Sequence, residues 1–389
     1  MQPAEFDVLI VGGGLAGLSL ACALRDARLR LALVEQFPPR PVSGWDARVY
    51  AISPANVDLL SDIGVWRHLP AERMAPIRAM EVYGDGGARL DFSAYETGID
   101  ELGWILESSL IAGELWENVK RQSNLTLFCP GSPASLSAGP DAAVLTLADR
   151  TLLRARLLVG ADGRDSWVRE ALGLRAFESD YHEKGVVANF ACQRAHRGIA
   201  RQWFRDDGVL AWLPLPGDRI SIVWSTSTEK AEEMLGLTPD QLCAKVAAAG
   251  HGALGGLTLL TPPAAFPLRL MLVPRIIGPR LALLGDAAHA IHPLSGHGIN
   301  LGLQDARSLA GLLTRVPEWQ DVGAERLLQR YQRQRREETL LLQCVTHALH
   351  DLFASRWPGL RTLRNLGMRL TDQVPVVKNL LVRYATGIV

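Results

Sequence analysis

The chain contains 389 residues, of which 48% are hydrophobic and 21% charged, and its 41 basic and 41 acidic residues give a formal net charge of zero. This length allows two or three packed units with a substantial core, and the composition excludes a disordered or fibrous protein. Balanced charge gives no indication of nucleic-acid binding, and we expect none. The five cysteines are dispersed without a C-x-x-C pair. That pattern is typical of reduced thiols in the cytoplasm and does not suggest a disulfide framework.

The sequence reaches a core strand after six residues, so we expect no signal peptide. No uninterrupted apolar run has the length that is needed to cross a bilayer. We therefore expect a cytoplasmic protein that is soluble or, at most, bound to the surface of a membrane.

Residues 7–35 form the best-defined motif of the chain. They predict a strand, a helix and a second strand at 8–11, 15–24 and 31–34. Gly12, Gly14 and Gly17 form G-x-G-x-x-G at the first turn, where they permit a sharp bend, a close approach to a pyrophosphate and tight helix packing. Glu35 follows at the spacing where a carboxylate accepts a hydrogen bond from an adenosine ribose. The stretch predicts a dinucleotide on a helix N-terminus and leaves open which dinucleotide.

Between this motif and residue 160 the sequence predicts helices mixed with short strands. After a proline-rich loop, a helix is expected to start at Ser53-Pro54, and Arg48, just before it, is by itself a solvated surface charge. The other elements expected here are a hairpin at 77–92, a helix at 104–119 and strands at 125–128, 143–147 and 152–158.

Asp162-Gly163 follows directly on the last of these strands. Polar groups at the carboxyl ends of parallel strands are where α/β folds bind ligands. A plain turn, followed by a helix at 167–172 that Ser166 caps, is an equally good interpretation.

Residues 185–226 differ in pattern from the mixed helices and strands before them. They contain runs of strand-forming residues, which are broken at 206–208 and 214–218. They predict an antiparallel sheet that interrupts the nucleotide-binding unit and faces a substrate. The sheet contains Trp203, Trp212 and Trp224, which could bind an apolar ligand. The alternative is that they are ordinary core residues.

A second strand–acid–glycine–helix pattern begins at residue 281. Gly285-Asp286 ends a strand at 281–284. A rigid turn and a helix start follow, marked by Pro293, Gly296, Gly298 and Asn300. The backbone N–H groups of 297–299 can meet a negative group there.

Beyond residue 325 the chain is mostly helical. Residues 356–389 contain six basic residues and one acid, Asp372. A basic, apolar tail of this kind can lie on an anionic membrane or an acidic partner. A solvated basic face on helices that pack against the body is at least as good an interpretation.

Together, the glycine motif with Glu35, Asp162-Gly163 and Gly285-Asp286 resemble the class A flavoprotein monooxygenase family over essentially the whole chain. Within it, the sequence is most similar to the ubiquinone-biosynthesis aromatic hydroxylases of the UbiH/VisC type. The segments that carry the likeness are RVYAIS, DGRDSWVRE, GDAAHAIHPLSGHGINLGLQDA and the tail around PVVK.

The resemblance implies an α/β (α+β) fold in which a Rossmann-like FAD-binding domain carries an inserted antiparallel β-sheet substrate domain and C-terminal helices. The FAD-binding domain is expected at 1–76, 101–180 and 273–322, the substrate domain at 77–100 and 181–272, and the C-terminal helical region at 323–389.

FAD is the cofactor that the resemblance implies, with NAD(P)H as reducing co-substrate. Glu35 should bind the adenosine ribose, Asp286 the ribitol chain, and Arg48 a position near the flavin. Asp162 belongs to a motif near both FAD and the nicotinamide donor. The cofactor-binding residues expected are Gly12, Gly14, Ala16, Gly17, Glu35, Arg48, Asp162, Gly163, Gly285, Asp286, Gly296, Gly298, Ile299 and Asn300.

Pro293, His297 and Gly298 should surround the flavin ring, with no single acid or base among them. The helix that starts after Gly298 should aim its N–H groups at the pyrimidine edge, where the reduced flavin carries negative charge. Two residues depart from the family pattern. His297 stands where glutamine is common, and we expect it to hydrogen-bond as glutamine would. Ser109 stands where relatives often carry arginine.

No metal site is expected. His289, His292 and His297 lie on a proline-broken loop without a matching acid or cysteine cluster. The chemistry is instead expected to come from the cofactor.

The function implied is hydroxylation of an aromatic ring of a polyprenylated phenol or quinol in ubiquinone biosynthesis, with O2 and a flavin C4a-hydroperoxide. The expected location is cytoplasmic, peripheral on the inner face of the cytoplasmic membrane or in a ubiquinone-biosynthesis complex. Two alternatives stay open: a flavin hydroxylase of a small soluble aromatic or secondary metabolite, and a non-catalytic prenyl-binding escort protein.

Overall fold

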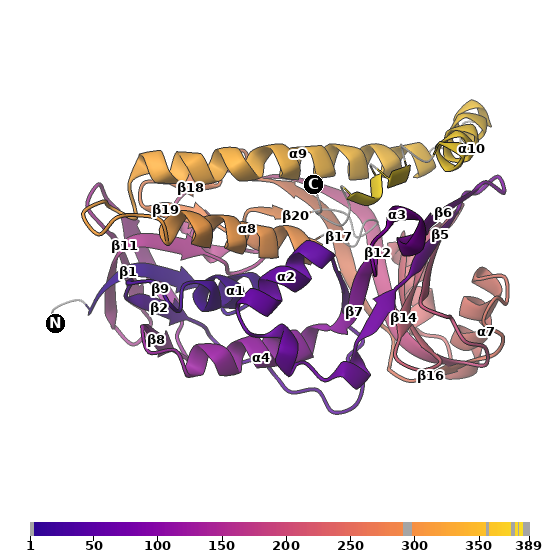
Figure 1. Cartoon of the computed structure of the whole chain (residues 1–389), viewed down its shortest axis with the longest axis horizontal. Helices are drawn as coiled ribbons and strands as arrows, with labels where there is room; N and C mark the ends of the chain where they lie inside the picture. The colour runs from indigo at the N-terminus through magenta and orange to yellow at the C-terminus, as the bar shows by residue number, and fades with distance from the viewer. Residues whose placement is uncertain (1–3, 291–297, 355–357, 375–377, 380, 384–389) are drawn as a thin grey trace.

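The computed structural model describes residues 4–290, 298–354, 358–374, 378–379 and 381–383. Two sheets organise the molecule (Figure 1): a largely parallel one at the end that carries the N-terminus, and a largely antiparallel one toward the other end. Helix α9 runs along the top of the molecule in this view, and α8 lies below it. The fold is mixed α/β, as the sequence predicts.

The first sheet is built around β1, whose residues from Val8 to Val11 are buried. Its strands, in spatial order, are β18 (Ile277–Gly278), β19 (Leu281–Leu283), β11 (Leu152–Gly160), β1 (Ala4–Val11), β2 (Leu31–Val34) and β8 (Leu125–Phe128). From β19 to β8 neighbouring strands are parallel. The short apolar runs of β1, β2 and β19 are typical of strands that are covered on both faces.

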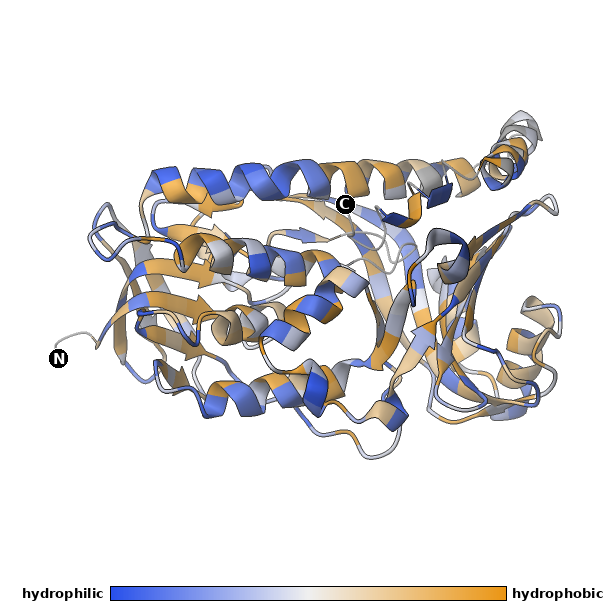
Figure 2. Ribbon diagram, viewed as in Figure 1, coloured by the Kyte–Doolittle hydropathy of each residue, from blue (hydrophilic) through white to orange (hydrophobic). Residues whose placement is uncertain are grey.

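Helices pack against this parallel sheet and against one another. They are α1 (Leu15–Ala23), α2 (Pro54–Asp62), α4 (Ser108–Lys120), α5 (Trp167–Ala171), α8 (Gly298–Leu313) and α9 (Glu325–Ala354). Helix α1 packs against both α4 and α8. Figure 2 shows hydrophobic strands inside and hydrophilic outer faces on α4 and on the first half of α9.

The second sheet mixes segments from distant parts of the sequence. Its order is β20 (His289–Ala290), β17 (Ala264–Leu272), β12 (Phe177–Cys192), β15 (Arg219–Ser227), β14 (Gly208–Leu215), β13 (Ile199–Arg205), β5 (Ala79–Tyr83) and β6 (Arg89–Ser93), with β16 (Leu257–Leu259) beside β12. Helices α6 (Thr228–Leu235) and α7 (Pro239–Ala249) pack on one face and close a separate core.

A small sheet joins the two larger units. It consists of β3 (Val49–Ile52), β7 (Gly103–Glu107) and β4 (Ala75–Ile77). The expected helix at 104–119 is corrected here, because its first four residues belong to β7 and the helix begins at Ser108. Ile105 and Leu106 are both buried, and cross-strand pairing with β3 and β4 outweighs the helical spacing of the apolar residues.

Short elements complete the fold: β9 (Pro133–Ala138), β10 (Ala143–Leu147), α3 (Ala94–Thr97), α10 (Pro358–Gln373) and single turns of 3-10 helix at Trp66–His68, Ala71–Arg73 and Gly285–Ala287. The sequence did not predict β9 or α6. Within the part of the chain that the structure describes, no helix is both long and apolar enough to cross a lipid bilayer.

Candidate active site

The glycine turn connects β1 to α1 and fits tightly against the end of β11. Gly12 has φ of +110°, and a Cβ atom there would lie 2.3 Å from the carbonyl oxygen of Ala161. A Cβ on Gly17 would lie 2.1 Å from the carbonyl oxygen of Gly12. Both positions therefore exclude a side chain, as the G-x-G-x-x-G motif predicts.

Gly14 differs from the other two glycines because it faces outward. It is exposed, and a Cβ there would meet no protein atom within 4 Å. As the N-cap of α1, Gly14 leaves the first N–H groups of the helix at an open surface. Open space before a helix N-terminus suits a phosphate group, so this turn fits the pyrophosphate of FAD.

Glu35 lies beside the same turn. One carboxylate oxygen accepts a hydrogen bond from the Gly13 amide, and the other accepts from the amides of Gln36 (2.7 Å) and Phe37 (3.0 Å). The side chain thus braces the turn at the end of β2. Its contact with an adenosine ribose stays a prediction, which this placement suits.

Asp162 is held by local hydrogen bonds. Its two carboxylate oxygens accept from the Ser166 hydroxyl (2.6 Å) and the Val168 amide (3.0 Å), and Ser166 accepts from the Arg169 amide (3.0 Å). The side chain therefore caps α5, which is the turn-and-cap interpretation. Gly163 follows at φ of +86°. The backbone of Asp162 abuts Gly12, since a Cβ on Gly12 would lie 2.6 Å from the Asp162 amide nitrogen.

The Gly285-Asp286 turn meets the glycine turn directly. Gly285 has φ of +59°, and a Cβ there would lie 3.1 Å from the Cβ of Ala16. A Cβ on Gly302, in α8, would lie 3.3 Å from the Cα of Gly285. Asp286 itself is exposed. The structure thus brings together two motifs that lie about 270 residues apart in the sequence.

Tyr50, on β3, links Arg48 to Asp286, and sequence reasoning did not single it out. The Arg48 guanidinium lies 5.7 Å from the centre of the Tyr50 ring. Burial is the main cause that raises the pKa of Tyr50, Arg48 lowers it, and the negative charge of Asp286 raises it further. Both predicted cofactor residues are therefore close enough to act on one phenol group.

Asp46 fixes the backbone in front of Arg48. One of its carboxylate oxygens accepts from the Arg48 amide (2.9 Å) and the other from the Ser109 amide (3.1 Å) at the start of α4. Its carbonyl oxygen accepts from the side-chain amide of Asn189, in β12 (2.8 Å). This loop thus joins the parallel sheet to the second sheet, and Ser109 contributes its backbone at the position where relatives often carry arginine.

Asn300 anchors the start of α8. Its side-chain oxygen accepts from the Ser53 amide (3.0 Å) and the Asn56 side chain (2.9 Å), and its side-chain nitrogen donates to the Ala51 carbonyl (2.7 Å). Gly298 and Ile299 form the first residues of the helix. The predicted residues Pro293, Gly296 and His297 lie outside the described residues.

A buried ionic network lies beneath the Gly285-Asp286 turn. One oxygen of Asp305 accepts from His289 (2.6 Å) and from the Gly285 amide (3.0 Å), and the other accepts from Arg335, in α9 (2.6 Å). All three side chains are buried. Burial works against the charge of Asp305, but His289 and Arg335 outweigh it, so that the pKa of Asp305 is lowered.

This network explains the role of His289, one of the three histidines that were considered as metal ligands. His289 is bonded to Asp305, and His292 lies outside the described residues, as does His297. The network was not predicted, because Asp305 and Arg335 are 30 residues apart on different helices. The only available signal was the acid of LQDA, which ends one of the segments that carry the family likeness.

The three tryptophans suggested as substrate contacts are core residues in the structure. Trp203, Trp212 and Trp224 are buried in the core that α6 and α7 close. Side chains alternate along a strand, so their neighbours point to the other face. Asn189 on that face contacts the loop before Arg48, and Phe204 stacks on Phe353 of α9. The correction is physical: a strand's sequence does not tell which face is covered by helices.

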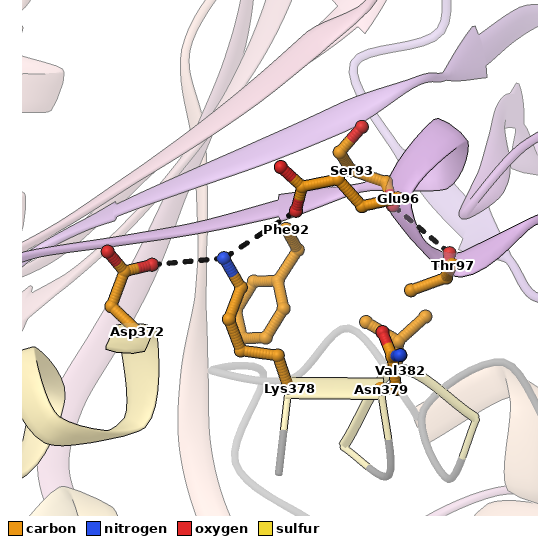
Figure 3. Close-up of a pocket in the computed structure, with 8 residues that line it drawn as sticks. All are labelled: Phe92, Ser93, Glu96, Thr97, Asp372, Lys378, Asn379 and Val382. Atoms are coloured by element: carbon orange, nitrogen blue, oxygen red, sulfur yellow. Dashed lines mark hydrogen bonds and ion pairs between the residues drawn. The ribbon is translucent and has the colours of Figure 1, made fainter. Parts of the chain in front are cut away.

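A pocket of about 390 Å³ lies elsewhere, between β6, α3 and the C-terminal segment. Figure 3 shows Lys378 between two acids, with its nitrogen 3.1 Å from Asp372 and 3.7 Å from Glu96. The pocket is lined by Phe92, Ser93, Glu96, Thr97, Asp372, Lys378, Asn379 and Val382. None of these is a predicted cofactor residue, and the ion pair of Lys378 with Glu96 ties the C-terminal segment to α3.

Asp286→Ala is expected to weaken FAD binding by about 10- to 100-fold, because a charged hydrogen bond to the ribitol chain would be lost. Asp286 is exposed, so stability should change little. FAD titration by flavin fluorescence measures the effect, and the exposed Asp141→Ala is the matched control. Equal FAD affinity in both variants would remove Asp286 from the site.

Comparison with known proteins agrees with this geometry. A family model described as an FAD binding domain matches residues 5–110 and 136–341. The chain is 33% identical to 3-demethoxyubiquinol 3-hydroxylase of Escherichia coli, over 100% of this chain and 99% of the relative. It is 34% identical to the ubiquinone hydroxylase UbiL of Rhodospirillum rubrum, over 98% of this chain and 89% of the relative.

A solved structure shows the same fold. Pseudomonas aeruginosa PqsL, in complex with 2-aminobenzoylacetate, superposes with a TM-score of 0.78 at 24% identity and covers 94% of this chain and 99% of its own. The glycine turn, the Gly285-Asp286 turn and the start of α8 all lie within the residues that the FAD binding domain model matches. The chain is an enzyme of the FAD-dependent aromatic monooxygenase family, of the ubiquinone-hydroxylase type.

Proposed function

We propose that this enzyme hydroxylates an aromatic ring of a polyprenylated phenol or quinol in ubiquinone biosynthesis, with O2 and NAD(P)H as co-substrates. The observation that carries the proposal is the packing of Gly285 against Ala16, which brings together the two motifs that are predicted to bind FAD. The substrate class rests on the two bacterial relatives, whose names are those of ubiquinone hydroxylases and whose similarity extends over nearly the whole chain.

The residues present divide the binding of FAD among them. The N-terminus of α1 would hold the pyrophosphate, Glu35 the adenosine ribose and Asp286 the ribitol chain. The N-terminus of α8 would support negative charge on the ring system. When bound, FAD supplies the redox chemistry, the acceptance of electrons from NAD(P)H and the activation of O2.

The protein's own share in the reaction is orientation and exclusion of water. Asn300 holds the start of α8 against β3, and Asp46 holds the loop of Arg48 against the second sheet. These bonds keep the helix N-terminus, Arg48 and the sheet at fixed positions around the reacting ring. A rigid enclosure of this kind suits a reaction in which the cofactor does the chemistry.

Location follows from the substrate. A polyprenylated phenol dissolves in lipid, so we propose that the enzyme works at the inner face of the cytoplasmic membrane. The supporting features are the exposed Arg369 and Arg383 of the C-terminal segment and the substrate named for the relatives.

A purified, FAD-loaded enzyme tests the substrate class. With NAD(P)H and O2, it is expected to hydroxylate a prenylated phenol in detergent micelles and to leave 4-hydroxybenzoate unchanged, as mass spectrometry of the products would show. Comparable turnover of 4-hydroxybenzoate would favour a hydroxylase of small soluble aromatics instead. A protein that stays colourless after incubation with FAD would favour a prenyl-binding escort.

A further inference from the structure

Helix α10 packs on the protein through its polar side chains. Arg364 is buried and forms an ion pair with Asp85, in the turn between β5 and β6. Asn365, also buried, donates to Asp85 (2.9 Å) and accepts from the Gly86 amide (3.1 Å). Two helical turns further on, Asp372 accepts from the Asp91 amide (3.3 Å). The described contacts of α10 with this hairpin are therefore mainly hydrogen bonds and ion pairs, with Met368 as an apolar residue beside Gly84.

The outward face of α10 is apolar. Leu366 and Leu370 are 50% and 54% exposed, and Val374, directly after the helix, is 43% exposed. Their spacing of four residues places them on one side of the helix. A helix on the surface of a protein ordinarily has the opposite arrangement, with its apolar side inward. The bonds to Asp85 and Gly86 fix the rotation of α10, so its apolar side cannot turn inward without breaking them.

The position of α10 leaves this face accessible. Figure 1 shows the helix at the far end of α9, at the edge of the molecule and close to the tip of the β5–β6 hairpin. Leu341 and Val345, one turn apart on α9, and Leu381 are also about half exposed. Single exposed leucines are common, but a row of them opposite a bonded polar face indicates a surface that something covers.

The charges beside this row identify what covers it. Asp372 is the only acid in α10, and it is bonded to Lys378 and to the Asp91 amide. Arg369, next to Leu370, is exposed, as is Arg383, near Leu381. Leucine flanked by arginine, without an outward acid, is the composition of helices that lie in the interface of anionic membranes.

We propose that the outward face of α10, formed by Leu366, Leu370 and Val374 with Arg369 beside them, lies on an anionic membrane surface. This inference rests on the proposed function, since a lipid-dissolved substrate gives the contact its purpose. It also changes the assignment of the basic tail: Arg364 stabilises the fold from inside, and the apolar residues supply most of the membrane affinity.

Vesicle flotation tests this surface. The full-length, FAD-loaded protein should bind vesicles that contain phosphatidylglycerol better than pure phosphatidylcholine vesicles. Leu366→Gln with Leu370→Gln should weaken binding at least about tenfold. Leu235→Gln with Leu260→Gln, at two leucines that are exposed elsewhere, is the matched control and should bind as the unchanged protein does.

Further readouts separate folding, function and membrane contact. Thermal unfolding and FAD content should stay unchanged in both leucine variants, and Arg369→Gln should reduce the preference for anionic vesicles even if the leucine variant folds poorly. Hydroxylation of substrate in detergent should persist in the leucine variant, whereas hydroxylation of substrate in vesicles should fall. If the unchanged protein hydroxylated the substrate neither in detergent nor in vesicles, that result would count against the proposed function and not against the membrane contact.

Two results would overturn the membrane assignment. One is equal vesicle binding by the leucine variant and the unchanged protein. The other is a dimer of the unchanged protein, seen by light scattering, that the leucine substitutions dissociate, because this face would then be covered by a second copy of the chain.

Discussion

Asp305→Asn is expected to destabilise the protein by about 3–5 kcal/mol, the typical cost of breaking a buried ion pair. Asp305 uses both carboxylate oxygens, one for His289 and the Gly285 amide, the other for Arg335. Asparagine has one acceptor oxygen, so it leaves either Arg335 or the turn without its partner. Because Gly285 precedes the predicted ribitol contact, FAD affinity should fall as well.

Urea unfolding of the FAD-free protein and FAD titration measure the two effects separately. Asp26→Asn is the control, because Asp26 is exposed and its ion pair with Arg25 should contribute little. A change of less than about 1 kcal/mol in Asp305→Asn would contradict the role given to the network.

The pH dependence of this contribution has a definite sign. Because its folded pKa is lowered, Asp305 is ionised at neutral pH, and its contribution to stability is fully present above the unfolded value of about 3.9. That contribution is lost as pH falls below this value and through the folded pKa. The stability difference between Asp305→Asn and the unchanged protein should therefore shrink only in acid.

Gly12→Ala is expected to abolish FAD binding and to destabilise the protein by several kcal/mol. The added Cβ would lie 2.3 Å from the Ala161 carbonyl oxygen and 2.6 Å from the Asp162 amide nitrogen. These contacts involve backbone, so neither atom can move aside cheaply, and φ of +110° adds strain for any residue other than glycine. Purified protein should be colourless, and thermal unfolding should occur at a lower temperature.

Two neighbouring substitutions make this result interpretable. Gly14→Ala meets no protein atom, so it should leave stability unchanged and weaken FAD binding only if the pyrophosphate occupies that space. Gly113→Ala, within α4 and without contacts, should stabilise the protein by about 0.5–1 kcal/mol. If Gly14→Ala retained full FAD affinity, the predicted placement of the pyrophosphate would be wrong.

Local chemistry explains what the sequence predicted well. Gly12 and Gly17 lie only five residues apart, and they contact each other within the same short segment. Their spacing is therefore sufficient to predict a strand, a bend and a helix. The hairpin at β5–β6 and the helix start at Ser53-Pro54 follow in the same way from turn residues.

Features that depend on contacts between residues far apart in the chain could not be predicted from the sequence. Trp212 was assigned to a substrate pocket, but which face of its strand is covered depends on α6 and α7, and these pack there only in the folded chain. Arg364 was counted with the basic tail, whereas its ion pair joins it to Asp85, nearly 280 residues earlier. Such pairings leave no local pattern to read.

Incorporation of oxygen from ¹⁸O2 is the most direct measurement of what this enzyme does. With FAD, NAD(P)H and a prenylated phenol under ¹⁸O2, mass spectrometry should find one ¹⁸O atom in the ring of the hydroxylated product, and none when only the water is labelled. Unlabelled product under ¹⁸O2, or none from FAD-loaded enzyme on the prenylated phenol, would contradict hydroxylation by an FAD-dependent monooxygenase of this class.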